Sequence, residues 1–286
     1  MDEGLGGGVR RRELVEWVGG SGEGEVLAVR GDVVVVKVGD VVVKVHEVGT
    51  DVDGLAARVR VAAAVGGLLL PPVLGPAVVR GRVVTAWPLG TPVSSDGALP
   101  MEEAGRLLAA LHRVRVPGPV PPARAWSRVE RAVRDVPDVV GADVVLRAFA
   151  TLGPDRGGDV LVHGDWHLGQ LVWRDGWRLI DVDDIGVGDP AWDLARPAAL
   201  FAAGVLEPGV WSRLLDAYLD AGGVAVRRDD PWEGLERPAR ALVVQMAARA
   251  LTAAERDGKA LTEAQGALLD ACGRIVAGWA GGGLGG

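Results

Sequence analysis

Residues 162–173 read VHGDWHLGQLVW, residues 179–184 read LIDVDD and residues 188–195 read GDPAWDLA. Asp181 follows the apolar pair Leu179-Ile180, so a short strand can carry its carboxylate into a cleft. Asp165 follows a glycine, which is typical of a turn. Carboxylate oxygens are the hard ligands that Mg²⁺ prefers. These segments are therefore the candidate catalytic region.

The three motifs, in this order and spacing, resemble those of the aminoglycoside phosphotransferase and choline kinase-like family, the small-molecule branch of the protein kinase-like fold. That family carries His-Gly-Asp, an Asn at the position of Gln170, Ile-Asp, and Gly-Asp-Pro-x-x-Asp-Leu-Ala. The resemblance runs from about Gly20 to Val276. It implies a two-lobed α+β fold with a small antiparallel β-sheet N-lobe and a mainly helical C-lobe.

By this resemblance, Asp165 is the catalytic base or the residue that orients the acceptor hydroxyl. Asp181 is the main metal ligand, and Gln170 is a second one, because its amide offers the same carbonyl oxygen as the commoner Asn on one more methylene. A role of Gln170 as a simple loop hydrogen-bonder stays open. The implied cofactors are ATP or GTP and Mg²⁺, the pair that phosphoryl transfer requires.

The remaining motif residues fall into two groups. His163, Asp189 and Asp193 are expected to support the catalytic loop, and Asp189 can also cap the helix that follows Pro190. Side chains near the cleft are candidates for binding the substrate, with packing or a solvated turn as the alternative: Trp166, His167, Asp183 and Asp184.

A lysine in the first lobe should grip the α- and β-phosphates. Lys37 and Lys44 each lie in a Val-Val-Val-Lys-Val pattern. Lys44 is preferred because the family places this lysine on the third strand, before a helix. Residues Ala86, Trp87 and Pro88 occupy the hinge position and are the candidates for binding the nucleotide base.

The acidic partner of this lysine is not evident. The helix after the third strand carries Arg58 and Arg60 over residues 55–62, and no acid. Lys44 is therefore expected to be held by Asp181, by another acid or only by the nucleotide.

The expected organisation is a flexible leader (1–10), a nucleotide-binding N-lobe (11–90), a catalytic and substrate-binding C-lobe (91–280) and a flexible tail (281–286). Valine-rich runs broken by Gly-Asp pairs predict strands 25–30, 33–38 and 41–46. Apolar periodicity predicts helices, and these cover 11–18, 51–65, 101–114, 124–136, 142–152 and most of 192–276.

The composition of the 286-residue chain excludes several classes of protein. A net charge of −7, all of it in residues 150–286 because residues 1–149 are neutral, argues against general binding to nucleic acid or anionic membrane. One cysteine excludes an intramolecular disulfide, and Pro71-Pro72 interrupts the apolar stretch 61–79 that could otherwise suggest a membrane span. A cytoplasmic protein is expected.

The resulting functional expectation is transfer of the γ-phosphoryl group to a hydroxyl of a small polar molecule. The acidic second half favours a cationic acceptor such as an aminoglycoside or another basic antibiotic, which would confer resistance. The Gly-Gln form of the loop is similar to that of maltokinases and some aminosugar kinases, so a sugar is the alternative acceptor. The absent helix acid leaves a third possibility, a nucleotide-binding pseudokinase scaffold.

Overall fold

The computed structural model describes residues 4–5, 8–94, 97–116 and 118–282. The chain divides into two compact units, which are described separately. The first, here called the sheet unit, comprises residues 1–94, 117–121 and 169–183, and the second, the helical unit, comprises 95–116, 122–168 and 184–286. The sheet unit therefore takes in the segment 169–183 as well as the predicted N-lobe range.

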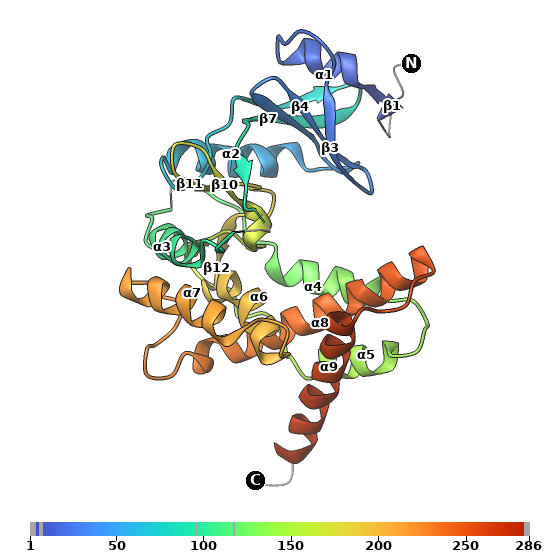
Figure 1. Cartoon of the computed structure of the whole chain (residues 1–286), viewed down its shortest axis with the longest axis vertical. Coiled ribbons are helices and arrows are strands. Elements are labelled where there is room, and N and C mark those ends of the chain that lie inside the picture. The colour runs from blue at the N-terminus through green and yellow to red at the C-terminus, as the bar shows by residue number, and fades with distance from the viewer. Residues whose placement is uncertain (1–3, 6–7, 95–96, 117, 283–286) are drawn as a thin grey trace. The chain divides into compact units, whose positions relative to one another are not determined.

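The sheet unit is built on a five-stranded antiparallel sheet (Figure 1). Its strands, in spatial order, are β3 (Glu25–Arg30), β4 (Val33–Val38), β5 (Val41–Val45), β7 (Arg82–Pro88) and β6 (Leu74–Val79). On β4, Val34, Val36 and Val38 are buried and alternate with partly exposed residues, as a sheet with one core face requires. The predicted meander of three valine-rich strands is confirmed.

Two helices complete the N-terminal part of the sheet unit. The core of the sheet unit, here called the valine core, is a cluster of buried side chains: Val9, Val34, Val36, Val38, Val43, Val45, Val84 and Ala86. Helix α1 (Arg11–Trp17) contributes Leu14 and Val15 to it. Helix α2 (Val52–Ala64) begins after Asp51, whose side chain accepts a hydrogen bond from the Gly54 amide at 3.1 Å, and it packs against β6.

Part of the predicted leader forms secondary structure. Strand β1 (Gly4–Leu5) pairs with β2 (Val9–Arg10), and the Val9 side chain is fully buried in the core of the sheet unit. The flexibility of segment 1–10 stays a prediction. The predicted tail begins inside α9 (Glu263–Gly282) and otherwise lies outside the described residues.

The segment 169–183 joins the sheet unit through its backbone. Strands β10 (Leu171–Trp173) and β11 (Trp177–Leu179) form an antiparallel hairpin, to which β8 (Thr91–Pro92) adds a third strand. The Leu179 carbonyl also accepts a hydrogen bond from the Leu70 amide at 3.0 Å. These pairings fix Asp181, two residues after β11, relative to the large sheet.

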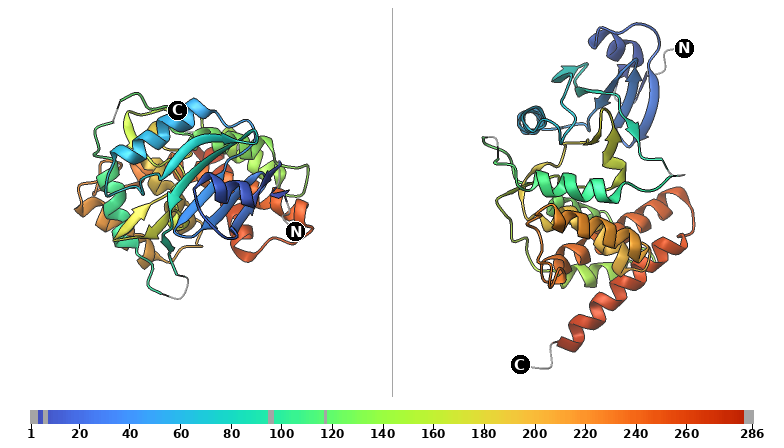
Figure 2. Two further views of the ribbon diagram at one scale, coloured as in Figure 1. Left: turned by 90° about the horizontal axis from the view of Figure 1, so that it is seen from above. Right: turned by 60° about the vertical axis from the view of Figure 1, so that its left-hand side comes forward.

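The helical unit is mainly α-helical, with one short sheet of β9 (Val160–Val162) and β12 (Gly186–Gly188). Its helices are α3 (Met101–Leu111), α4 (Ala125–Arg134), α5 (Ala142–Ala150), α6 (Ala191–Ala202), α7 (Pro208–Asp220), α8 (Trp232–Asp257) and α9. Helices α8 and α9 pack on each other, as the right-hand view of Figure 2 shows, and α8 also packs on α4 and α6. In the described residues, no helix is long and apolar enough to cross a membrane.

Candidate active site

The strand pattern of the sheet unit gathers three polar side chains. Val43 and Val45 on β5 are fully buried in the core, so Lys44 and His46 project from the opposite face of the sheet. Thr85 on β7 lies directly opposite Lys44 in the ladder and therefore shares that face. An ammonium, an imidazole and a hydroxyl are thus brought together.

Lys44 makes two ion pairs on this face. Its Nζ lies 2.7 Å from Asp181 Oδ1 and 2.8 Å from Asp183 Oδ2. Burial alone would lower the pKa of Lys44, but the charges of Asp181 and Asp183 outweigh it and hold the pKa well above its usual value. The ammonium is therefore charged at every physiological pH.

Lys37 has different surroundings. Its Nζ pairs with Glu25 Oε2 at 3.2 Å, and both side chains are exposed. Of the two lysines, it is Lys44 that the fold places beside Asp181, the predicted metal ligand.

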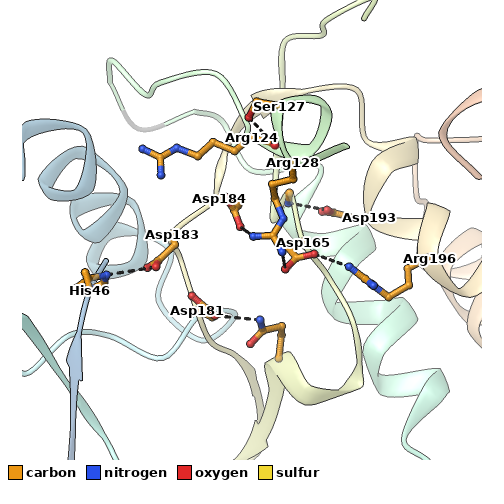
Figure 3. Close-up of polar contacts among 12 residues, drawn as sticks. His46, Arg124, Ser127, Arg128, Asp165, Asp181, Asp183, Asp184, Asp193 and Arg196 are labelled. Atoms are coloured by element: carbon orange, nitrogen blue, oxygen red, sulfur yellow. Dashed lines mark hydrogen bonds and ion pairs between the residues drawn. The ribbon is translucent and has the colours of Figure 1, made fainter. Parts of the chain in front are cut away.

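Asp183 is held in turn by His46. His46 Nδ1 lies 3.3 Å from Asp183 Oδ2, and His46 Nε2 lies 2.8 Å from Thr85 Oγ1. Because Thr85 Oγ1 accepts a hydrogen bond from Trp87 Nε1 at 2.9 Å, its own hydroxyl hydrogen can donate to His46 Nε2. That assignment places the imidazole hydrogen on Nδ1, where it donates to Asp183 (Figure 3).

This arrangement identifies the acidic partners of Lys44, which residues 55–62 of the sequence do not supply. Asp181 and Asp183 supply the carboxylates for Lys44, and both come from the segment after β11 rather than from α2. Burial would raise the pKa of Asp183, but Lys44 and His46 hold it far below its usual range. In this structure, Asp183 faces the lysine, and sequence reasoning had assigned it to the substrate.

Asp181 and Gln170 lie together, as expected for two ligands of one metal. Gln170 Nε2 donates to Asp181 Oδ2 at 3.1 Å, and Gln170 is buried. Asp181 has a φ of +64°, a left-handed conformation that residues other than glycine rarely adopt and that occurs preferentially at functional sites.

These two side chains fit Mg²⁺ only if a phosphate shares its coordination. One carboxylate and one amide oxygen are hard ligands, and Mg²⁺ is commonly bound by one or two carboxylates together with substrate phosphates. Among the residues that the structure describes, no group of three or more His, Cys, Asp or Glu side chains could hold a metal by itself.

The helical unit holds Asp165 between two arginines (Figure 3). Arg196 from α6 donates to Asp165 Oδ1 at 2.6 Å, and Arg128 from α4 donates to Asp165 Oδ2. The other arm of Arg128 donates to Asp184, which is buried. Sequence reasoning missed both arginines, because nothing in their local sequence sets them apart from the many others in the chain.

The turn that carries Asp165 is anchored by Asp193 of α6. The fully buried Asp193 carboxylate accepts hydrogen bonds from the backbone amides of His163 at 2.7 Å and Gly164 at 2.8 Å. His112 Nε2 lies 3.0 Å from the same carboxylate. Burial would raise the pKa of Asp193, but the bond from His112 and the charges around it hold the pKa below its usual value.

Gly164 is required at its position. Its φ is +83°, and a Cβ built there would lie 2.4 Å from the Asp184 carbonyl oxygen. The sequence His-Gly-Asp therefore reflects a close approach of two backbone segments within the helical unit.

The other predicted residues of the helical unit have defined surroundings. Asp189 Oδ1 accepts a hydrogen bond from the Ala191 amide at 2.9 Å at the start of α6, and burial raises the pKa of Asp189. His163 is fully buried and His167 is half-buried. Trp166 is 2 % exposed, and its role in binding the substrate stays a prediction.

The predicted hinge lies on the end of β7. The Ala86 carbonyl accepts a hydrogen bond from the Val73 amide at 2.8 Å, and Ala86 is buried. Trp87 and Pro88 are partly exposed. Of the three residues proposed for the nucleotide base, the latter two are the more accessible.

Comparison with known proteins identifies a matching family and several similar folds. The model of a phosphotransferase enzyme family matches residues 3–236. No curated protein matches the chain. Among solved structures, a thermostable mutant of an aminoglycoside phosphotransferase superposes with a TM-score of 0.65 at 14% identity, covering 95% of this chain and 99% of that one.

Two further structures are similar. A choline/ethanolamine kinase family protein from Mesorhizobium loti gives a TM-score of 0.63 at 18% identity, with 93% of this chain and 92% of that one covered. A macrolide 2'-phosphotransferase from Brachybacterium faecium gives 0.52 at 19% identity, with 92% and 95% covered. The predicted two-lobed kinase-like fold is confirmed by these likenesses.

Proposed function

Because the chain belongs to the phosphotransferase enzyme family, we propose that it transfers the γ-phosphoryl group of ATP or GTP to a hydroxyl of a small polar molecule. The observation that carries this proposal is the partly buried ion pair of Lys44 with Asp181, at 2.7 Å. A lysine and a metal-binding aspartate in contact are the two parts that kinase-like phosphoryl transfer requires on the nucleotide side. A similar aminoglycoside phosphotransferase has been solved with AMP-PNP and hygromycin B.

On the nucleotide side, the Lys44 ammonium would bind the α- and β-phosphates, and residues 86–88 would bind the base. Asp181 and Gln170 would hold Mg²⁺, which when bound offsets the negative charge of the phosphates. Asp183 and His46 act as positioning residues: they keep the Lys44 side chain extended across the face of the sheet.

On the acceptor side, Asp165 orients the hydroxyl and receives its proton. The hydroxyl oxygen forms a bond to the γ-phosphorus as the bond between that phosphorus and the bridging oxygen breaks, and the nucleoside diphosphate leaves. The ion pairs with Arg128 and Arg196 fix the direction of the Asp165 carboxylate. Asp193 fixes the backbone of the same turn.

Two classes of acceptor are candidates: a basic antibiotic, and a sugar or related polyhydroxy compound. The charge of −7 in residues 150–286 favours a basic antibiotic. The side chains that contact Asp165 are arginines, however, and interactions between solvent-exposed charges fade beyond about 10 Å at ordinary ionic strength. The nearest charges should therefore dominate, and they favour a sugar or a related polyhydroxy compound over an aminoglycoside.

The observation that suggested the pseudokinase alternative has another explanation. Residues 55–62 contain no acid, but Lys44 has two carboxylate partners from a different segment, Asp181 and Asp183. A catalytically inert scaffold would keep its biological activity when Asp165 is replaced, whereas an enzyme would lose most of its turnover.

The test is release of ADP or GDP in the presence of Mg²⁺, measured over a panel of neutral sugars, sugar acids, sugar phosphates, aminosugars and basic antibiotics. For any acceptor that turns over, Asp165→Asn should lower kcat by about 10²–10⁴-fold while AMP-PNP still binds, because the variant removes only the group that takes the proton. Asp143→Asn, at an exposed carboxylate on α5, is the control and should be unchanged. Wild-type turnover in the Asp165 variant, or no turnover with any acceptor, would contradict the proposed function.

A further inference from the structure

A small pocket of the helical unit borders Asp165. Its lining comes from the loop that carries Asp165 and Trp166, from Arg128 on α4, from Arg196 on α6 and from Gln245 on α8. The pocket has room for about one water-sized group, such as a single oxygen atom of a larger molecule.

Among the buried polar atoms of these lining residues, the donors Trp166 Nε1 and Arg196 Nε and the acceptor Gln245 Oε1 have no hydrogen-bond partner in the described part of the chain. Trp166 and Gln245 are each 2 % exposed, so water at the surface does not satisfy them. Because a buried polar group without a partner costs about 1–3 kcal/mol, three of them in one pocket indicate that something else binds there.

The donors and acceptor match a hydroxyl group. A hydroxyl oxygen can accept from Trp166 Nε1–H and Arg196 Nε–H, and its hydrogen can be donated to Gln245 Oε1. Such a hydroxyl would lie beside Asp165, where the proposed function expects the acceptor.

A third arginine adds charge to this region. Arg249 lies one helical turn after Gln245 on α8, so both side chains lie on the same side of that helix. Burial lowers the pKa of Arg249, the positive charges of Arg128 and Arg196 lower it further, and the negative charges of Asp165 and Asp184 offset part of this effect. The Arg249 side chain nevertheless reaches solvent, and it makes no hydrogen bond or ion pair with any residue in the described ranges.

The local charges do not balance. Three guanidinium groups (Arg128, Arg196 and Arg249) share two carboxylates (Asp165 and Asp184), and both carboxylates form ion pairs with Arg128 or Arg196. Like charges held close together repel unless an anion offsets them. Within a unit whose surplus of carboxylates makes it acidic, this is a positive patch beside the predicted catalytic residue.

We propose that this pocket and Arg249 form the acceptor subsite, and that the acceptor is a hydroxylated anion whose carboxylate or phosphate group binds Arg249 while a hydroxyl enters the pocket. The inference rests on the proposed function only in calling this molecule the acceptor. Its binding to the subsite is independent of phosphoryl transfer and can be measured without nucleotide.

The test compares four molecules built on one sugar ring by calorimetric titration of the whole chain without nucleotide. Glucuronate carries a carboxylate, glucose 6-phosphate a phosphate, glucose no charge and glucosamine a positive charge. At least one of the two anions should bind about tenfold or more tightly than glucose, and glucosamine should bind most weakly. The better of the two anions identifies the source of the negative charge. Equal binding of all four, or tightest binding of glucosamine, would overturn the proposal.

Variants locate the binding site. Arg249→Gln should weaken binding of the preferred anion about tenfold and leave the Kd of glucose unchanged, because only the charged contact is lost. Gln245→Leu should weaken binding of the anion and of glucose alike. Arg240→Gln is the matched control: it removes the same charge from α8, nine residues earlier and on about the opposite side of the helix. An effect of Arg240→Gln equal to that of Arg249→Gln would show a general charge effect and reject the subsite.

The two proposals fail in different ways. If the anion binds through Arg249 but is never phosphorylated, the subsite stands and the proposed function fails. If phosphoryl transfer occurs to neutral or basic acceptors and Arg249→Gln changes nothing, the proposed function stands and the anionic acceptor is rejected.

Discussion

At the scale of single residues, the chain uses neighbouring carboxylates for different tasks. Asp181 and Asp183 both pair with Lys44, whereas Asp184, the next residue, pairs with Arg128. The motif alone located all three acids but could not assign their partners. Those partners are distant in the sequence. The register of β5 against β7 positions Lys44, and the packing of α4 positions Arg128.

The two strand lysines provide a first prediction. Lys44→Met should lower kcat/KM for the nucleotide by about 100-fold or more, because it removes a fixed positive charge from the transferring phosphates. Lys37→Met removes a charge of the same sign from the same face of the sheet, but its partner is the exposed Glu25. Steady-state kinetics of both variants should therefore show a change of less than about twofold for Lys37. Equal losses in the two variants would contradict the assignment of Lys44.

Asp193, which anchors the loop that carries Asp165, provides a prediction about pH. The pKa of Asp193 is lower in the folded chain than its unfolded value of about 3.9. Its stabilising contribution is therefore fully present above pH 4 and is lost as the pH falls through the folded pKa. The difference in unfolding free energy between the wild type and Asp193→Asn, from urea titrations, should be largest near pH 7 and shrink below pH 4.

Replacement of Asp189 is a control, because its effect on stability should change with pH in the opposite direction. Because burial raises the pKa of Asp189, its carboxylate opposes folding more strongly as the pH rises through its unfolded pKa. Replacing it by Asn should therefore become relatively more favourable toward pH 7. The same pH trend in both variants would argue against the burial assigned to these groups.

At the scale of elements, the sequence predicted best where turn residues bound a valine-rich run. Strands β3 and β4 have the predicted bounds, since valine favours strands and Gly-Asp pairs mark the turns between them. The positions of strands of only two residues, such as β2 and β8, were not predicted. Strand β8 depends on a distant partner, β10, and strand β2 depends on burial of Val9.

The packing of α3 on α7 makes a prediction at this scale. A Cβ at Gly105 of α3 would lie 2.5 Å from the Leu214 carbonyl oxygen and 2.9 Å from the Tyr218 amide nitrogen. Gly105→Ala should therefore destabilise the chain by about 1–3 kcal/mol, because backbone cannot yield as a flexible side chain can.

Gly266 in α9 is the matched control, since a Cβ there meets no atom within 4 Å. Gly266→Ala should stabilise the chain by about 0.5–1 kcal/mol through helix propensity alone. Chemical denaturation of both variants measures the pair. A stabilising Gly105→Ala would mean that α3 and α7 do not pack closely.

At the scale of the whole molecule, each compact unit combines segments that are far apart in the sequence. A division drawn from sequence at residues 90 and 91 follows the motifs, but the compact sheet unit also includes 169–183. The division passes between Asp183 and Asp184, and each of these adjacent carboxylates pairs with a residue of its own unit. Net charge was also a poor guide to the site, because it averages over a unit whose acids and arginines are unevenly distributed.

Binding of nucleotide provides a prediction at this scale. AMP-PNP with Mg²⁺ at about 100 times its Kd should stabilise the chain by about 2.7 kcal/mol, which appears as a rise in Tm. Lys44→Met should reduce this rise at the same ligand concentration, and Lys37→Met should not. The absence of any rise in the wild type at saturating nucleotide would argue against the nucleotide site.

The pairing of Lys44 with Asp183 and His46 also constrains how related sequences can diverge. An acid on the helix after β5 could form the ion pair with the lysine that Asp183 forms here. A related sequence therefore needs only one of these two acids. Loss of Asp183 would leave His46 facing an empty position, and selection on both residues would relax together. Among homologues, the Asp183–His46 pair and a glutamate on α2 should therefore replace each other, so that ancestry can be traced from which of the two a sequence retains.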